Sequence, residues 1–103
     1  MELLKVRFMR ESSYKIPDGK LVKVKLQVSV GQIENIKILG DFFLHPEEAI
    51  QNIEEALIGA PEDENIIETR ISNTLAEMEA SFIGATARDI AKTIMIAWEA
   101  NDL

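Results

Sequence analysis

The hydrophobic periodicity of this chain changes across one short stretch, Gly40–Glu48. Before it, apolar and polar side chains alternate with the period of two that is typical of half-buried strands. After it, apolar side chains recur every three or four residues, as they do on one face of a helix. Strands followed by helices indicate an α+β fold. The sequence therefore predicts a single domain, 1–103, in which a three-stranded antiparallel β-meander is followed by three helices packed on one face (β-β-β-α-α-α).

Three segments have the alternation of strands: residues 3–10, 20–30 and 33–39. The second is the clearest, because five apolar residues alternate strictly with polar ones, which favours an antiparallel strand with one wet face. The side chains expected on the inner face are Leu4, Val6, Phe8, Val22, Val24, Leu26, Val28, Val30, Ile36 and Ile38.

The predicted strands are joined by two connections. Ser12–Lys20 is expected to be irregular, with a turn at Pro17-Asp18-Gly19. Gly31-Gln32 is expected to form a short hairpin with Gly31 in the first corner position. Ile33 is out of step with the inner face, which predicts a β-bulge beside this hairpin.

Helices are predicted over residues 46–58, 62–78 and 86–99. Pro46 suits a first helical position, where its missing N–H costs nothing, and Gly59 is placed to end the same helix. Thr86 and Asp89 have the spacing of a capping box. Residues 79–86 are expected to be a loop from which Phe82 and Ile83 reach the core.

The net charge of −7 conceals an asymmetry along the chain. Residues 1–39 carry eight Lys or Arg against four Asp or Glu, whereas residues 40–80 carry eleven acidic residues against one Arg. A bipolar surface of this kind steers an oriented partner. Charges taken on for solubility alone explain the same pattern, and both interpretations stay open.

Few residue types that carry catalysis or bind metals are present. There is no Cys, so disulfides and thiolate ligands are excluded, and the single His is His45. A general base is one interpretation of His45, and a helix-entry residue is the other. The glycines form no phosphate-binding loop. We therefore expect no catalytic residue and no metal site in this chain.

The sequence contains no targeting or membrane signal that we recognise. Its start lacks the pattern of a signal peptide, and no apolar run approaches the ~20 residues of a membrane span. Since a small fold without disulfides suits a reducing compartment, we expect a cytoplasmic protein that does not bind membranes.

The outer face of the predicted sheet is basic. It gathers Lys5, Arg7, Lys23, Lys25 and Lys37. RNA-binding sheets place aromatic residues on this face for base stacking, but here the outward residues are Lys, Arg, Gln, Ser and Asn. We therefore expect no nucleic-acid partner, although binding through charge alone remains an alternative.

Two adjacent aromatic residues, Phe42 and Phe43, follow the last predicted strand. On a strand end they face opposite sides. One of them can enter the core, while the other is either covered by helices or anchors an interface, where aromatic residues are favoured.

Several segments resemble the C-terminal accessory domain of lipoate–protein ligases, which some archaea and bacteria encode as a separate small subunit. The match covers residues 15–60 best and includes Gly19–Val24, Gly31–Ile33, Ile38–Ile50 and Ile53–Gly59. Its most specific part is Gly40-Asp41-Phe42-Phe43 placed two residues before Pro46-Glu47-Glu48. The two later helices match in pattern only.

The resemblance implies an accessory subunit that is not an enzyme on its own. Its partner would be the catalytic subunit, which activates lipoate with ATP as lipoyl-adenylate and transfers the lipoyl group to a lysine of a lipoyl carrier domain. Lipoate, ATP and magnesium would then belong to the complex and not to this chain alone. The residues expected to contact the partner are Gly40, Asp41, Phe42, Phe43, His45 and Glu47.

Two other classes of function compete with this one. The first is a free-standing binding module that uses the basic sheet face for an anionic ligand or nucleic acid. The second is an independent enzyme built on His45 and a carboxylate. For each residue of the corner, a role in the fold alone also remains open.

Overall fold

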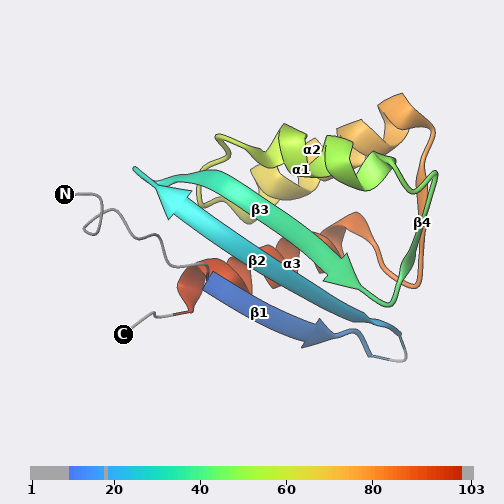
Figure 1. The fold of residues 1–103 in the computed structure, drawn as a ribbon, viewed down its shortest axis with the longest axis horizontal. Coiled ribbons are helices and arrows are strands. Elements are labelled where there is room, and N and C mark those ends of the chain that lie inside the picture. Colours follow the sequence, from blue (N-terminus) through green and yellow to red (C-terminus); the bar gives the residue numbers. More distant parts are fainter. Residues whose placement is uncertain (1–9, 18, 101–103) are drawn as a thin grey trace.

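The fold consists of a three-stranded antiparallel sheet, three helices and a small two-stranded ribbon (Figure 1). The structure is a computed structural model and describes residues 10–17 and 19–100. The elements in chain order are β1 (Arg10–Lys15), β2 (Leu21–Ser29), β3 (Gln32–Gly40), β4 (Phe43–His45), α1 (Ala49–Leu57), α2 (Glu64–Met78), β5 (Ser81–Ile83) and α3 (Ala87–Glu99). The α+β fold class predicted from the change in periodicity is confirmed.

The helices cover one face of the β1-β2-β3 sheet. α3 packs against β1 and β2, α1 packs against β3, and α2 contacts both other helices. Buried apolar side chains fill the space between the layers, because each strand directs alternate residues towards the helices. The buried residues of the sheet are Val22, Val24, Leu26, Ile33, Ile36 and Ile38.

The first strand differs from the prediction. Residues 3–9 of the predicted strand 3–10 lie outside the described residues, and so do Leu4, Val6 and Phe8. β1 instead runs through the first part of the predicted connection and pairs with β2, with Ser12 opposite Val24 and Lys15 opposite Leu21. The expectation of an irregular segment from Ser12 was wrong, because polar contacts with α3 hold this strand. Arg10 Nη1 donates to the Trp98 carbonyl at 2.8 Å, and Ser12 Oγ donates to the Thr93 carbonyl at 2.7 Å.

The β2–β3 hairpin turns one residue earlier than predicted. Its corner residues are Val30 and Gly31, with φ of 54° and 73°, so Gly31 takes the second position of a primed turn and not the first. Val30, expected on the inner face, is 95% exposed as a result. The predicted bulge is confirmed, since the register shifts between Gln27 and Val28 and returns Ile33 to the core.

Two of the helices begin later than predicted. Residues 46–48 form a turn in which the Pro46 carbonyl accepts from Ala49 N–H at 3.1 Å, so Pro46 is not in a first helical position. The His45–Pro46 bond is cis. Gly59 follows the end of α1 with φ of 87°, as its predicted role requires. At α2, the carboxylate of Asp63 accepts from Ile66 N–H at 3.1 Å and sets a start at Glu64.

The third helix begins with the predicted cap. Thr86 Oγ1 accepts from Asp89 N–H at 3.1 Å, and Asp89 Oδ2 accepts from Thr86 N–H at 3.0 Å. Both halves of the capping box at the start of α3 are therefore present.

The predicted loop 79–86 contains a short strand. β5 pairs with β4, with Phe43 opposite Ile83 and His45 opposite Ser81. Because neighbouring strand residues face opposite sides, Phe82 turns inward and Ile83 is 61% exposed. The expectation that both reach the core is correct for Phe82 only. Within residues 10–17 and 19–100, no helix is both long and apolar enough to span a bilayer.

Candidate protein-docking site

The corner between the sheet and α1 begins at Gly40, whose backbone requires glycine. Its φ is 154°. A Cβ at this position would overlap the Leu21 carbonyl oxygen and would lie 2.6 Å from the Phe42 ring. Gly40 therefore lets the chain turn closely past β2, which is a role in the fold.

Asp41 also serves the fold, because it ties the corner to β2. Its backbone N–H donates to the Leu21 carbonyl at 3.1 Å, and its Oδ1 accepts from the Leu21 N–H at 2.6 Å. The carboxylate thus replaces the main-chain acceptor that a continuing strand would supply.

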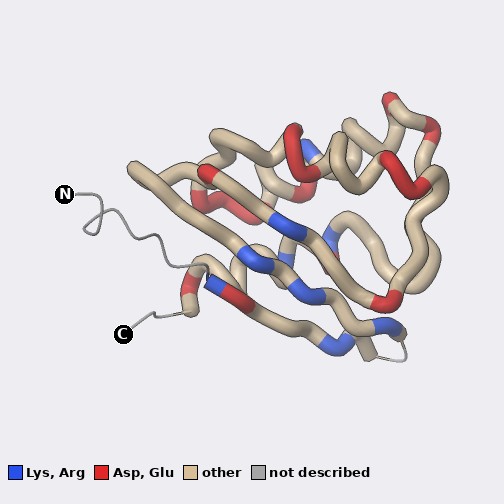
Figure 2. The backbone as a smooth tube through the Cα atoms, viewed as in Figure 1, with Lys and Arg blue, Asp and Glu red and all other residues tan. Residues whose placement is uncertain are grey.

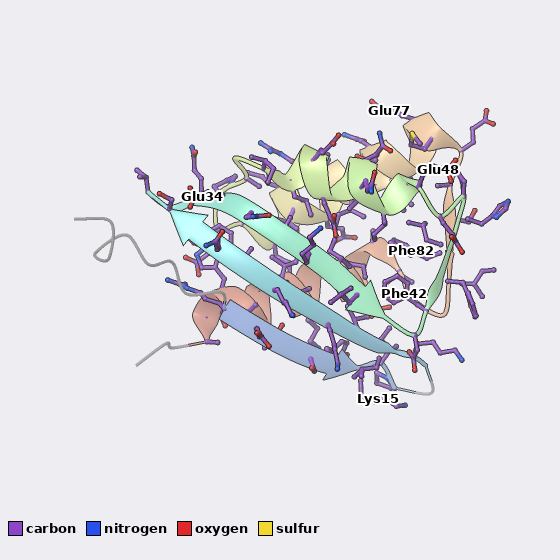
Figure 3. All side chains as sticks on the ribbon, in the orientation of Figure 1. Lys15, Glu34, Phe42, Glu48, Glu77 and Phe82 are labelled. Carbon is purple, nitrogen blue, oxygen red and sulfur yellow. The ribbon has the colours of Figure 1, made fainter. Side chains whose placement is uncertain are left out.

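The two aromatic residues separate as their adjacency predicts. Phe42 is half-buried and packs edge-to-face on Phe82, with 5.4 Å between ring centroids (Figure 3). Phe43 points the other way and is 64% exposed, opposite the exposed Ile83 across the β4–β5 pair. Leu39, which is 46% exposed, belongs to the same end of the molecule. We call the exposed set Leu39, Phe43 and Ile83 the corner patch.

A hollow of about 270 Å³ lies at this corner. It is lined by Ile38, Leu39, Gly40, Phe42, Phe43, Leu44, Glu47 and Ile50. Four of the six residues predicted to contact a partner therefore line one concave surface: Gly40, Phe42, Phe43 and Glu47. Asp41 and His45 are not among its lining residues; His45 is exposed on β4, two positions after Phe43. The structure thus brings four of these six residues together on one concave, partly apolar surface.

A second hollow of about 380 Å³ follows the same strand and was not predicted. It is lined by Asn35, Ile36, Lys37, Gln51, Glu54, Glu55 and Ile58. Glu54 reaches across from α1, and its Oε2 accepts from the Ile38 N–H at 2.8 Å. The available sequence signal was the polar face of α1, but only the packing of α1 beside β3 shows that this face borders a strand edge.

The face of the sheet opposite the helices is basic, as predicted (Figure 2). Lys23, Lys25 and Lys37 are exposed, and Lys25 lies directly opposite Lys37 across β2 and β3. Lys5 and Arg7 lie outside the described residues. Across the described part of the chain, no three His, Asp or Glu side chains gather where they could hold a metal ion.

Together, these features define a small α+β domain with a concave, partly apolar corner. The family can be named from the sequence itself. A family model described as the C-terminus of bacterial lipoate protein ligase matches residues 5–94, and the chain belongs to this family. No curated protein matches the chain.

A solved structure supports the same assignment. The chain is similar to one from an archaeal lipoylation system of Thermoplasma acidophilum, described as a bipartite lipoate protein ligase and its E2 lipoyl domain. The two share 25% sequence identity with a TM-score of 0.71, and the match covers 86% of this chain and 97% of the other.

Proposed function

We propose that this chain is the accessory small subunit of a two-component lipoate–protein ligase. It docks on the catalytic subunit and supports the ATP-dependent adenylation of lipoate for protein lipoylation. The observation that carries the proposal is the family match over residues 5–94. The match to the archaeal chain, 97% of which is covered, adds support, because a stand-alone chain of similar length exists in a bipartite ligase system.

The two hollows beside β3 do not fit ATP or lipoate. The corner hollow contains one charged side chain, the carboxylate of Glu47, and the second contains Glu54 and Glu55 against Lys37. Carboxylates repel a triphosphate and a fatty-acid carboxylate alike. The proposal therefore assigns lipoate, ATP and magnesium to the complex, with the reacting groups supplied by the catalytic subunit, and makes this chain non-catalytic on its own.

An accessory subunit can accelerate adenylation without reacting groups. In that reaction the lipoate carboxylate attacks the α-phosphorus of ATP and pyrophosphate leaves. The step is fast only when the two substrates are held in a reactive geometry and the adenylate is shielded from water. A rigid domain that docks beside the catalytic site can order the partner's loops for both purposes.

The corner patch is the part of the surface best suited to docking. Phe43 and Ile83 present large apolar side chains side by side, next to a concavity. Aromatic residues beside a pocket dominate the energy of many interfaces. Gly40 and Asp41 keep the patch in place through their contacts with β2.

The test is reconstitution. The chain is mixed with a catalytic ligase subunit that lacks its own accessory domain. Lipoate-dependent pyrophosphate release is then measured for each component alone and for the mixture, together with co-elution on gel filtration. The proposal expects co-elution and pyrophosphate release from the mixture. If the components neither co-elute nor gain activity on mixing, the subunit assignment fails, and turnover by this chain alone would make it an enzyme instead.

One observation favours a second candidate, a module that binds anions. Exposed lysines gather on a sheet face that none of the described helices covers. Titration with a single-stranded oligonucleotide at two salt concentrations tests it. Tight binding that weakens steeply with salt would promote this candidate.

A further inference from the structure

β3 is an edge strand whose outer side faces no other strand. The sheet order is β1-β2-β3, and the pairing of β2 with β3 fixes which backbone groups of β3 point outward. Asp41 N–H donates to the Leu21 carbonyl, so this pair is hydrogen-bonded. Hydrogen-bonded and non-hydrogen-bonded pairs alternate along an antiparallel ladder. The backbone groups of Lys37 therefore bond to those of Lys25, whereas the backbone N–H and C=O groups of Ile36 and Ile38 point away from β2.

Only some of the outward-pointing backbone groups of β3 form hydrogen bonds within the protein. At one end, Ile33 N–H donates to Ala60 and its carbonyl accepts from Gly59, which closes the edge. In the middle, Ile38 N–H donates to Glu54. Among the described residues, no hydrogen bond occupies the N–H or C=O of Ile36 or the C=O of Ile38. A strand edge with unpaired groups is a template for pairing with another chain.

The two hollows follow one another along this open edge beside α1, and we call them together the trough. The first borders residues 35–37 and the corner hollow borders residues 38–40, while α1 and the turn before it supply the opposite wall. Residues 36–40 are long enough to pair with about five residues of a partner strand at ~3.4 Å per residue. The trough is bounded by the 59–60 loop at one end and by Phe43 at the other.

The charge of the trough indicates what it would accept. Its lining includes the carboxylates of Glu47, Glu54 and Glu55 against one cation, Lys37. The same lining includes the apolar side chains of Ile50, Ile58 and Phe43. An extended segment that carries both Lys or Arg and apolar residues is complementary to this surface.

We propose that an extended, Lys- or Arg-containing segment of the catalytic ligase subunit adds as a fourth strand to the outer edge of β3, in the trough beside α1. This proposal rests on the proposed function and specifies how the docking occurs. On binding, the partner backbone pairs with Ile36 and takes over the Ile38 N–H, which releases the carboxylate of Glu54 to pair with a partner cation. Phe43 packs at the end of the added strand, so that the trough and the corner patch form one interface.

The test measures amide hydrogen exchange by NMR on the isotopically labelled full chain, with and without the catalytic subunit. In the free chain, we expect the Ile36 amide to exchange fast and the Lys37 amide, bonded in the β2–β3 ladder, to exchange slowly. In the complex, the exchange of Ile36 should slow by about tenfold or more, as for a newly bonded strand amide. The Lys37 amide is the internal reference.

A charge reversal provides an independent measurement. Glu55→Lys lies in the trough, and Glu99→Lys at the far end of α3 is the matched control, since both residues are exposed and both substitutions change the net charge equally. We expect Glu55→Lys to weaken the complex by about tenfold at low salt, because a partner cation then meets a like charge. The control should change the affinity by less than about twofold.

The outcomes separate this proposal from the proposed function. A complex that forms while Ile36 keeps its free exchange rate overturns strand addition and leaves the subunit assignment intact. Failure to form any complex overturns both. Protection of Ile36 that rises with the concentration of this chain alone would show that a second copy occupies the edge, which also overturns the proposal.

Discussion

Individual residues at the corner differ in how much they contribute to the fold. Gly40 and Asp41 contact β2, and Phe42 packs on Phe82, so all three hold the corner together. Phe43, in contrast, is exposed to solvent. Substitutions at neighbouring positions should therefore affect different measurements.

Gly40→Ala should destabilise the fold strongly. The added Cβ would overlap the Leu21 carbonyl and the Phe42 ring at a backbone angle that disfavours side chains. We expect the free energy of unfolding to fall by about 2–4 kcal/mol in urea titrations. Gly31→Ala is the matched control, because its φ is also positive but no atom lies within 4 Å of the new Cβ. It should cost only about 1 kcal/mol; equal losses for the two variants would contradict the steric explanation.

Phe43→Ala should weaken docking while leaving the fold intact. Because the side chain is 64% exposed, its removal should change the free energy of unfolding by less than about 1 kcal/mol. An interface anchor of this size contributes about 2 kcal/mol or more, so affinity for the catalytic subunit should fall at least about thirtyfold in a calorimetric titration.

The control for this variant is the adjacent aromatic residue. Phe42→Ala removes the partner of Phe82 and should lower the free energy of unfolding by about 2–4 kcal/mol. If Phe43→Ala binds the catalytic subunit with unchanged affinity, the corner patch is not part of the interface.

At the scale of elements, hydrogen bonds made by side chains cap α2 and α3 and hold β1 against α3. The carboxylate of Asp63 starts α2, and the reciprocal pair of Thr86 and Asp89 starts α3. β1 depends in the same way on Arg10 and Ser12, which bond to carbonyls of α3. The caps join residues three apart and are visible in the sequence, whereas the bonds of β1 join residues more than eighty apart.

Thr86→Ala should destabilise the chain through α3 alone. It removes the acceptor for Asp89 N–H and should lower the free energy of unfolding by about 1 kcal/mol. The exposed Thr69 in the interior of α2 is the control, where alanine should be neutral or slightly stabilising because of its higher helix propensity. Urea titrations with circular dichroism detection measure both, and a cost at Thr69 equal to that at Thr86 would argue against the cap.

At the scale of the whole molecule, the sheet and the α1–α2 region carry opposite charge. Lysines gather on the open face of the sheet, and carboxylates gather on α1 and around α2 (Figure 2). The family assignment and the structural likeness describe a domain of a lipoate ligase system, and our proposal places the docking of the catalytic subunit on the acidic side, in the trough beside α1.

Association with the catalytic subunit should therefore depend on salt through the acidic side. We expect the association rate constant to fall by about tenfold between low and high ionic strength, measured by stopped-flow fluorescence. A double variant, Lys23→Ala and Lys25→Ala, should retain most of this dependence, since both lysines lie on the open sheet face and neither lines the trough. Loss of the salt dependence in the double variant would identify the lysine face as the docking surface instead.

Local sequence patterns were sufficient for the fold class, for β2 and for the capping box, because period-two and helical spacing act over short distances. Four of the residues that they singled out as partner contacts, Gly40, Phe42, Phe43 and Glu47, line the corner hollow. They were insufficient for β1, where polar residues are held by α3, and for β5, which exists only because β4 lies beside it. The start of α1 was misjudged since Pro46 suits both a turn and a first helical position.

By itself, the sequence determined that the strands of the main sheet precede the three helices, the inner face of β2 and β3, and the division of charge between the sheet and the α1–α2 region. These properties follow from the spacing of side chains along the chain. Only the tertiary structure decided that β3 is an open edge, that α1 stands beside it and that Glu54 bonds to Ile38. Pairing between strands and the approach of a helix depend on residues far apart in sequence, and no local period encodes which edge is left unpaired.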